Sequence, residues 1–493
     1  MIFSSVGKFS LRKEAELLVV PFWKRAKGVK AATALGALSA QVQGPINAKD
    51  FAAEEGETSL LYLSKGKERR CLLLGLGEEE NLTIDALRRV YSEVAKFCQS
   101  KSLSHINVVL PKITELRNLS LDECLQGISE GILLTNYQWE ELFTSSEKSV
   151  FLKSVVLVGV LPKLIGICHQ SEEIAEGVFF ARDLINGNAD QVTPNYLAKA
   201  ATKIAAELPS VTATILRKKQ IEKEKLDLLL AVSRGSTEDP AFITLSYKGH
   251  PRSKDHTVVI GKGVTYDTGG LNLKPTGFME TMREDMSGSA VALATLVVAA
   301  RLKLKVNVTA VVAATENGID GNSYKPGDVY SSHAGTSVEI VNTDAEGRLT
   351  LADAISYSVK KLKPTRMIDF ATLTGAMVVA LGEQMSGFFS NNDALADALL
   401  ASSEKTSEHL WRLPLFKPYR DLLKSDVADI KNCGTRAAGA VTAALFLEEF
   451  VEDVPWAHVD IAGTAFAKQE HHYQPKLGVG FGVRLMISFL QAL

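Results

Sequence analysis

An acidic pair and an arginine at alternating positions constrain this chain more than any other feature. The stretch NTDAEGRL at residues 342–349 places Asp344, Glu346 and Arg348 at every second position, separated only by alanine and glycine. In an extended backbone, alternate side chains point to one face, so we expect the three charged groups to lie together. Two neighbouring carboxylates repel each other unless a cation shares their site. The pattern therefore indicates a metal site beside a guanidinium that could hold an anion. The alternative is a polar turn before a helix over 349–361.

Composition places the chain among ordinary globular proteins. Its 493 residues are 46% hydrophobic and 23% charged, which favours two domains or three over a single core. The net charge of -2 gives no support for nucleic-acid binding. Five cysteines without C-x-x-C spacing predict free thiols in a reducing compartment. No apolar run reaches the roughly 18–20 residues of a membrane span, and the N-terminus does not resemble a secretory signal, so we expect a cytoplasmic protein.

Strand and helix signals alternate along the chain and predict two α/β domains. A smaller N-terminal α/β domain is expected over 1–165, and a larger C-terminal catalytic domain over 170–493, with a mixed or parallel sheet flanked by helices. Strands are predicted at 17–20, 71–76, 106–110, 155–160, 258–261, 306–314, 367–371 and 457–461. Helices are predicted at 84–100 after Thr83, 121–134, 171–185, 196–208 after Thr193 and Pro194, 288–302, 440–451 and 481–493.

A glycine-rich segment at residues 261–289 is the second place where reactive side chains gather. It contains Lys262, Asp267, Lys274 and Asp285, and it follows a predicted strand. Ligands of open α/β sheets bind at the carboxyl ends of strands. Taken singly, each of these residues would fit a solvated loop or a turn. Together with the acidic pair of the NTDAEGRL stretch, the carboxylates of Asp267 and Asp285 could supply an oxygen-rich cage for two divalent ions, an arrangement found in hydrolases.

The NTDAEGRL stretch resembles the diagnostic octapeptide of the leucyl aminopeptidases, the cytosol aminopeptidase family (peptidase family M17). Further blocks resemble the family in the same order: 261–270, 282–288, DFATLTGA at 369–376 and WAHVDIAGT at 456–464. Residues 181–198 resemble the entry to the catalytic domain, although they read NGNAD where the family usually has Asn-x-Pro-x-Asn. The resemblance covers residues 170–493, whereas the N-terminal part is similar to the family only in length and α/β character.

The resemblance implies two divalent metal ions, Mn²⁺ or Zn²⁺, held by five ligands. Oxygen-rich ligation with one amine does not choose between these metals. A lysine can ligate a metal only as the free amine, and burial beside a dication lowers its pKa in that direction. The implied ligands are Lys262, Asp267, Asp285, Asp344 and Glu346, with Asp267 and Glu346 bridging the ions and the carbonyl of Asp344 contributing as well.

Lys274 and Arg348 match the two catalytic side chains of the family. Two dications acidify a shared water enough to give hydroxide near neutral pH, which would attack the scissile carbonyl. Lys274 would stabilise the resulting oxyanion. Arg348 stays protonated, so it cannot itself be the base, and the resemblance implies that it holds a bicarbonate that moves the proton. An unblocked substrate α-amine on the second ion would explain exopeptidase action.

Substrate preference is a weaker inference from the same resemblance. The matching positions imply an apolar pocket of leucine size, although small apolar residues at these spacings also occur in an ordinary core. The expected reaction is the release of unblocked, preferentially leucine-like N-terminal residues from peptides during intracellular turnover. The implied pocket residues are Met282, Thr372, Gly375, Ala462 and Ala465.

Assembly and two rival functions complete the expectations. The resemblance implies a homohexamer, built as a dimer of trimers, with an assembly or regulatory role for the N-terminal domain. Some family members also bind DNA, so an additional regulatory role stays open, as does another two-metal hydrolase such as a phosphatase. His458 is expected to be a hydrogen-bonded core histidine, and Cys433 has no paired base that would make it a nucleophile.

Overall fold

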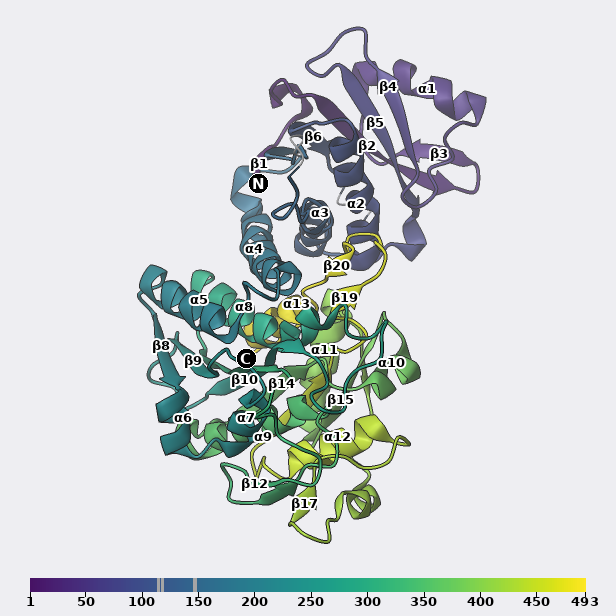
Figure 1. Cartoon of the computed structure of the whole chain (residues 1–493). Coiled ribbons are helices and arrows are strands. Elements are labelled where there is room, and N and C mark those ends of the chain that lie inside the picture. The colour runs from purple at the N-terminus through teal and green to yellow at the C-terminus, as the bar shows by residue number, and fades with distance from the viewer. Residues whose placement is uncertain (113–115, 117–118, 145–148) are drawn as a thin grey trace. The chain divides into compact units, whose positions relative to one another are not determined.

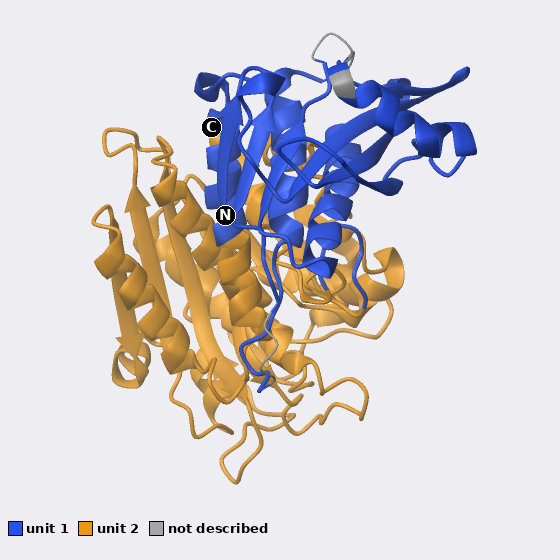
Figure 2. Cartoon of the chain, turned by 90° about the horizontal axis from the view of Figure 1, so that it is seen from above, with its two compact units in different colours: residues 1–176, 469–475 blue, residues 177–468, 476–493 orange. Residues whose placement is uncertain are grey.

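The computed structural model describes residues 1–493 except 113–115, 117–118 and 145–148, and it contains two compact units (Figure 1). Unit 1 comprises residues 1–176 and 469–475, and unit 2 comprises 177–468 and 476–493 (Figure 2). The division falls inside helix α4 (Gly166–Asn186), after the boundary expected near residues 163–171. The short return of the chain to unit 1 at 469–475 has no counterpart in the sequence-based prediction.

Unit 1 is built on a mixed sheet with the strand order β1-β7-β6-β2-β5-β4, in which β3 also pairs with β2. The pairs from β1 through β5 are parallel, whereas β3 and β4 are antiparallel to their neighbours. The strands are β1 (Ile2–Val6), β2 (Leu17–Arg25), β3 (Gly28–Ala31), β4 (Thr58–Tyr62), β5 (Arg70–Glu78), β6 (His105–Val109) and β7 (Ser154–Val158).

Two of the helices of unit 1, α2 and α3, begin where the sequence predicts, whereas α1 was not predicted. They are α1 (Ser39–Ala48), α2 (Ile84–Ser100) and α3 (Leu121–Thr135). Thr83 caps α2, because its hydroxyl accepts a hydrogen bond from the backbone N–H of Ala86 at 3.0 Å. Ser120 and Glu123 form a reciprocal capping box at the start of α3. Both predicted helices are therefore confirmed, with their first residues set by side chains that satisfy unpaired N–H groups.

Unit 2 is built on a second mixed sheet, with the order β16-β15-β18-β14-β10-β11-β9-β8. The central strands β18, β14, β10 and β11 are mutually parallel, and β15, β9 and β8 join them through antiparallel pairs. The strands are β8 (Val211–Arg217), β9 (Ala241–Lys248), β10 (Thr257–Asp267), β11 (Asn307–Asn317), β14 (Arg366–Ala371), β15 (Ser386–Ser390), β16 (Leu410–Arg412) and β18 (Trp456–Asp460).

The central strands were predicted and the outer ones were not. Strands buried on both faces read as continuous apolar runs, and VVIG at 258–261 is such a run. The outer strand β8 alternates buried or half-buried with exposed positions and carries two threonines, which weakens its signal. Two small sheets lie apart from the main one: β12 (Val329–Ser331) with β13 (Ser337–Glu339) and β17 (Ile430–Lys431), and β19 (Phe466–Ala467) with β20 (Leu477–Gly478).

Helices cover both faces of the unit 2 sheet, with α5, α8 and α13 on one side and α7, α9 and α12 on the other (Figure 1). Helix α8 is buried from Ser287 to Ala300, and its small residues allow close packing. A Cβ at Gly288 would lie 1.9 Å from the carbonyl oxygen of Phe370, so only glycine fits there. The unit 2 helices are α5 (Pro194–Glu207), α6 (Lys218–Glu224), α7 (Asp227–Ser233), α8 (Ser287–Arg301), α9 (Glu346–Tyr357), α10 (Gly375–Leu381), α11 (Asp393–Thr406), α12 (Gly439–Glu448) and α13 (Val483–Gln491).

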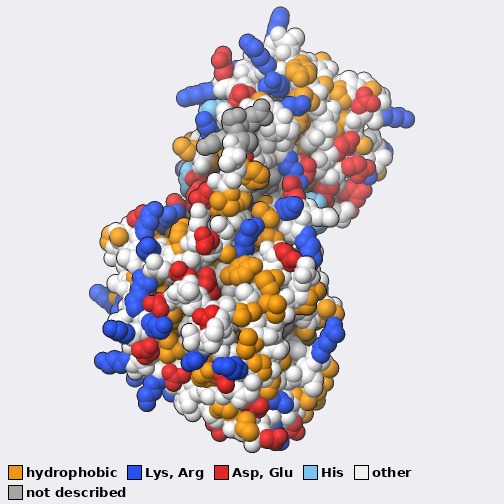
Figure 3. All heavy atoms as spheres, viewed as in Figure 1, with side chains coloured by type: hydrophobic (Ala, Val, Ile, Leu, Met, Phe, Trp, Pro, Cys, Tyr) orange, Lys and Arg blue, Asp and Glu red, His pale blue; other side chains and the backbone are white. Residues whose placement is uncertain are grey.

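The cysteines agree with the compositional expectation, and the surface carries charges of both signs. On the face drawn in Figure 3, basic and acidic side chains are interspersed over both units. All five cysteines are free thiols, as predicted. Within the described ranges, no helix combines the length and the apolar character needed to cross a bilayer.

Candidate active site

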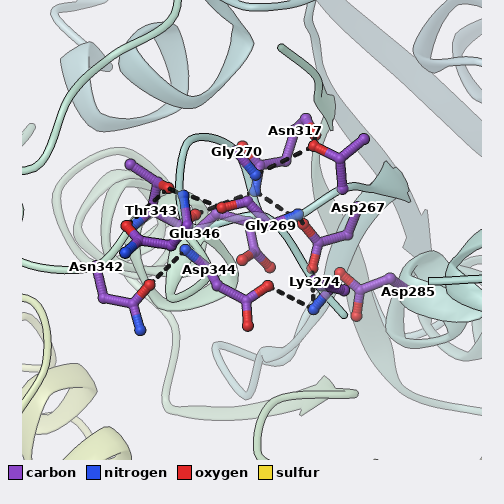
Figure 4. Close-up of polar contacts among 12 residues, drawn as sticks. Asp267, Gly269, Gly270, Lys274, Asp285, Asn317, Asn342, Thr343, Asp344 and Glu346 are labelled. Carbon is purple, nitrogen blue, oxygen red and sulfur yellow. Dashed lines mark hydrogen bonds and ion pairs between the residues drawn. The ribbon is translucent and has the colours of Figure 1, made fainter. Parts of the chain in front are cut away.

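Five of the predicted site residues lie together at the carboxyl edge of the central parallel strands of unit 2 (Figure 4): Asp267, Lys274, Asp285, Asp344 and Glu346. Strand β10 carries Lys262 and ends at Asp267, and the neighbouring β11 ends at Asn317. The chain that follows β10 brings Lys274 and Asp285 back to the same edge. This is the position at which open α/β sheets bind their ligands.

A β-bulge places Lys262 and Asp267 on the same side of β10. The two residues are five positions apart, so a regular strand would point them to opposite faces. However, the register with β11 pairs Val264 with Thr315 and Asp267 with Asn317, which leaves one extra residue on β10. Such an insertion reverses the alternation beyond it and re-aims the side chain.

The prediction that residues 344–348 are extended is wrong. Asn342 accepts a hydrogen bond from the backbone N–H of Asp344 at 2.8 Å, which forms a turn, and helix α9 begins at Glu346. Two residues apart on a helix, Glu346 and Arg348 point in different directions. Glu346 faces Lys262, whereas Arg348 donates through Nη1 to the backbone carbonyl of Asn432. The polar turn before a helix and the acidic pair of the candidate metal site are thus parts of the same structure.

Lys262 links two of the predicted ligands. Its Nζ lies 2.6 Å from Asp285 Oδ2 and 2.8 Å from Glu346 Oε1, and it donates to the carbonyl of Thr372 at 3.0 Å. The Thr372 hydroxyl donates to Asp285 Oδ1 at 2.7 Å. Because Lys262, Asp285 and Glu346 are at most 3% exposed, these charges interact with little screening by water.

Lys274 links the other two acids. Its Nζ lies 2.8 Å from Asp267 Oδ2 and 2.6 Å from Asp344 Oδ1. The remaining oxygen of Asp267 accepts from the backbone N–H of Gly269 at 2.8 Å and from the side-chain amide of Asn317 at 2.7 Å. The structure therefore brings all four acids and both lysines into one cluster, in which the carboxylates outnumber the ammonium groups. Figure 4 labels every member except Lys262.

Burial and charge shift the pKa values within the cluster in opposite directions. Burial raises the pKa of Asp267 and Asp285, and the Glu346 carboxylate adds to that effect. Burial also disfavours charge on Glu346, but Lys262 and Lys274 outweigh it and lower that pKa. Burial opposes the charge on Lys262 and Lys274 too, yet the surrounding carboxylates raise the pKa of both amines. Among the protein groups alone, both lysines are therefore ammonium ions.

The acids fit a divalent cation. Asp267, Asp344 and Glu346 each offer an oxygen, and these atoms lie within 4.8 Å of one another. Glu346 Oε2 is buried and accepts no hydrogen bond from any residue that the structure describes. Hard oxygen ligands and surplus negative charge are what a dication requires. Asp285 and Lys262 join this group through Glu346, so the five predicted ligands are contiguous.

Gly347, between Glu346 and Arg348, has to be a glycine because a larger side chain would collide with Lys262. A Cβ at Gly347 would lie 2.3 Å from Lys262 Cε and 2.7 Å from its Nζ. The space that glycine leaves beside the backbone is thus filled by the lysine side chain, which could not otherwise reach Glu346 and Asp285.

Gly347→Ala is therefore expected to displace Lys262 and to reduce turnover by about 10²-fold, the effect of disturbing one electrostatic partner in a buried site. The measurement is kcat at saturating metal, with thermal unfolding as a check on folding. Gly335→Ala, at a position with no atom within 4 Å of the added carbon but a φ of +98°, controls for the general cost of replacing glycine. Equal kcat in Gly347→Ala and wild type would contradict the steric assignment.

The predicted pocket residues lie on segments that border the cluster. Met282 begins the 3₁₀ turn that ends at Met286, Thr372 follows β14, and Gly375 begins α10 with open space where a Cβ would be. Ala462 follows β18 and is partly exposed, whereas Ala465 is 1% exposed and belongs to the core. Their assignment to a specificity pocket stays a prediction.

Several polar residues around the cluster were not predicted from the sequence. Asn317 and Tyr324 both donate to the carbonyl of Thr343, at 3.1 and 2.7 Å, and the Thr343 hydroxyl donates to the carbonyl of Gly269 at 2.7 Å. These bonds tie the octapeptide to the glycine-rich segment. Asn317 follows a predicted strand, so the rule that ligands gather at carboxyl ends of strands could have found it.

His458 is the hydrogen-bonded core histidine that the sequence predicts. Its Nδ1 lies 2.6 Å from Asp369 Oδ1, and Trp456 Nε1 donates to the other oxygen of that carboxylate at 2.7 Å. All three side chains are fully buried. Burial opposes the imidazolium, but Asp369 outweighs it and raises the pKa of His458.

The fold and the cluster together define an α/β protein with a candidate metal-hydrolase centre at the carboxyl edge of its larger sheet. Residues 179–487 match the catalytic domain of the cytosol aminopeptidase family, and residues 19–146 match the N-terminal domain of the same family. The chain belongs to the cytosol aminopeptidase family, and it is an aminopeptidase.

Relatives and solved structures agree with this assignment over the full chain. The chain is 47% identical to a probable cytosol aminopeptidase of Protochlamydia amoebophila and 50% identical to one of Chlamydia abortus, covering 100% of this chain and 99% of each relative. A tomato leucine aminopeptidase mutant is similar at TM-score 0.88 and 30% identity, covering 100% of this chain and 96% of that one. The bottromycin maturation enzyme BotP in complex with Mn is similar at TM-score 0.85 and 31% identity, covering 97% and 99%.

Proposed function

We propose that this chain is a dinuclear metal aminopeptidase that releases unblocked, leucine-like N-terminal residues from peptides. The observation that supports this proposal most is the cluster in which Lys262 joins Asp285 to Glu346 and Lys274 joins Asp267 to Asp344. The leucine aminopeptidase of tomato and the manganese complex of BotP, both similar over the whole chain, support the substrate class and the need for metal.

Five residues would hold the metal ions, which we take to be Mn²⁺ or Zn²⁺. When bound, two divalent cations supply an acidified water and a Lewis acid for the scissile carbonyl. Because the surrounding carboxylates favour the ammonium form of Lys262, this lysine would lose a proton when it becomes a ligand. The ligands are Lys262, Asp267, Asp285, Asp344 and Glu346.

Lys274 and Arg348 would act on the substrate and on the proton. The Lys274 ammonium lies at the edge of the cluster, with its side chain 14% exposed, so it can donate to a developing oxyanion. Arg348 is 6% exposed, and its Nε has no hydrogen-bond partner among the described residues. Although burial lowers its pKa, a guanidinium remains protonated at neutral pH. We propose that Arg348 would hold a bicarbonate ion, which would supply a base for the proton of the attacking water.

Selectivity and assembly form the remaining parts of the proposal. Met282, Thr372, Gly375 and Ala462 would border the pocket for the first side chain of the substrate, and the buried Ala465 would pack beside them. Small or apolar residues suit leucine. A homohexamer, arranged as a dimer of trimers, would use the N-terminal domain for assembly or regulation. The names of the relatives support action on peptides in the cytoplasm.

The metal-reconstituted enzyme is expected to cleave amides of leucine and similar residues, and to leave N-acetyl-leucine amide intact. Acetylation removes the free amine that an exopeptidase site must recognise. The measurement is a panel of aminoacyl p-nitroanilides with Mn²⁺ and Zn²⁺, and p-nitrophenyl phosphate tests for the rival two-metal phosphatase. Cleavage of the acetylated substrate, or faster release from the phosphate ester, would overturn the proposed function.

A further inference from the structure

Asn432 is a fully buried residue. Its side chain forms hydrogen bonds to the backbone of residues 341–345, the turn that contains the proposed ligand Asp344. Its Oδ1 accepts hydrogen bonds from the N–H groups of Val341 at 2.9 Å and Asn342 at 3.3 Å. Its Nδ2 donates to the carbonyl of Asn342 at 2.7 Å and, more weakly, to that of Ala345 at 3.4 Å. One amide group thus contacts both sides of the turn that leads into Asp344.

These contacts continue a β-ladder that stops just before the loop. Strand β13 pairs in parallel with β17, with Glu339 opposite Lys431. The backbone N–H of Asn432 still donates to the carbonyl of Glu339 at 2.9 Å. Beyond this point the chain turns, and a second backbone strand could not follow it. The side-chain amide has the same donor and acceptor as a peptide group, so it satisfies polar groups that would otherwise be buried without partners.

The backbone of Asn432 also contacts helix α9, which begins at Glu346. Its carbonyl accepts a hydrogen bond from Arg348 Nη1 at 3.0 Å. Arg348 is two residues beyond Glu346 at the start of α9. A single residue, remote in sequence, therefore contacts the turn before Asp344 through its side chain and Arg348 through its backbone.

We propose that Asn432 is a positioning residue that fixes the turn carrying Asp344, Glu346 and Arg348. It is not one of the proposed metal ligands, and it acts by holding the backbone of that turn in one conformation. This inference rests on the proposed function for its catalytic consequence, whereas its structural content concerns the loop alone. Partners of ligating side chains commonly contribute roughly 10- to 100-fold to metal affinity or activity.

Asn432→Asp tests the proposal with a change of one atom. The carboxylate keeps an acceptor for the two N–H groups but directs an oxygen at the two carbonyls, so the donor bonds are replaced by repulsion. Asn432→Ser also removes the Nδ2 donor, without adding charge. This variant replaces Asn432→Asp in the test if the aspartate variant does not fold. The expected result with full-length protein is Mn²⁺ binding weakened roughly 10- to 100-fold, and kcat lowered at saturating Mn²⁺ with little change in KM.

Asn307 provides a matched control. Its Nδ2 donates to the carbonyls of His250, Ser253 and Asp255 at 2.9–3.2 Å, and its Oδ1 accepts from the His250 N–H at 3.1 Å. It is the first residue of β11, at the end of the strand opposite the site. Asn307→Asp is therefore expected to destabilise the fold like the Asn432 variant while Mn²⁺ binding and kcat stay at wild-type values. Equal Mn²⁺ affinity and kcat in both variants would overturn the proposal.

Hydrogen exchange tests the positioning role of Asn432 independently of whether the protein is a metal aminopeptidase. Amides in a peptide spanning residues 340–349 are expected to exchange faster in the Asn432 variants than in wild type or Asn307→Asp, because the turn loses the hydrogen bonds from Asn432 Nδ2 to the carbonyls of Asn342 and Ala345. Unchanged exchange there would overturn the positioning role. If wild-type protein neither binds Mn²⁺ nor cleaves leucyl p-nitroanilide, the proposed function fails, and the exchange rates still decide the role of Asn432.

Discussion

Replacing Glu346 with alanine is expected to abolish peptide hydrolysis together with metal binding. Glu346 is 1% exposed, its Oε1 pairs with Lys262 at 2.8 Å, and its Oε2 has no hydrogen-bond partner in the described part of the chain. It is also one of the three acids whose oxygens lie within 4.8 Å of one another. Its loss removes the carboxylate that connects the two halves of the cluster. We expect turnover to fall by roughly 10³-fold or more, since charge stabilisation and metal are lost together.

The measurement pairs metal content with activity. Elemental analysis after dialysis against dilute Mn²⁺ is expected to show depleted metal in Glu346→Ala and in the isosteric Glu346→Gln. Glu408→Gln is a matched control, because Glu408 is also buried and accepts from the backbone N–H of Leu485 at 2.7 Å, at the start of α13. That variant should lose stability but keep its metals. Full metal occupancy in Glu346→Gln would refute the assigned role of this carboxylate.

The sequence predicted which charged residues belong together, but not how the backbone brings them there. Alternation suggested that Asp344, Glu346 and Arg348 share a face, whereas a turn and a helix separate them. The grouping survives because the turn points Asp344 at Lys274 and the helix start points Glu346 at Lys262. Tertiary contacts, which a local pattern does not contain, decided between strand and helix here.

The bulge in β10 illustrates a second limit of prediction from the sequence. Lys262 and Asp267 were both candidate ligands, yet their odd spacing contradicts a common face on a regular strand. The extra residue between Val264 and Asp267 resolves the contradiction, and it becomes visible only in the register with β11. Nothing in the glycine-rich sequence marks which residue is extra, because the bulge depends on the neighbouring strand.

Asn432 shows why supporting residues are harder to predict than ligands. Carboxylates and lysines in a glycine-rich segment attract attention because their charges are costly to bury. An asparagine is neutral, and its value here comes from contacts with residues about ninety positions upstream. The central strands and the long helices, by contrast, follow from local patterns such as the apolar run of β10 and the Thr83 cap of α2.

Lys274→Ala is expected to keep the metals and to lose turnover by about 10²-fold or more, the cost of removing one oxyanion donor. The Lys274 ammonium pairs with Asp267 at 2.8 Å and Asp344 at 2.6 Å, so its removal frees both carboxylates for a cation instead of removing a ligand. The neighbouring carboxylates raise the pKa of Lys274 despite its burial, so among the protein groups the variant removes an ammonium charge from the cluster.

The deciding comparison is between Lys274→Ala and Lys468→Ala. Lys468 is an exposed lysine whose Nζ lies 3.1 Å from Glu383, and its removal should leave both metal content and kcat unchanged. Metal content, kcat and KM for leucyl p-nitroanilide distinguish the roles, since loss of an interaction made only in the transition state lowers kcat without raising KM. Depleted metal in Lys274→Ala would make this lysine a support of the metal ligands. Retained metal with unchanged kcat would exclude it from the reaction. Only retained metal with a lowered kcat assigns the ammonium to the oxyanion, and this outcome would separate the two lysines of the cluster into a ligand and a catalyst.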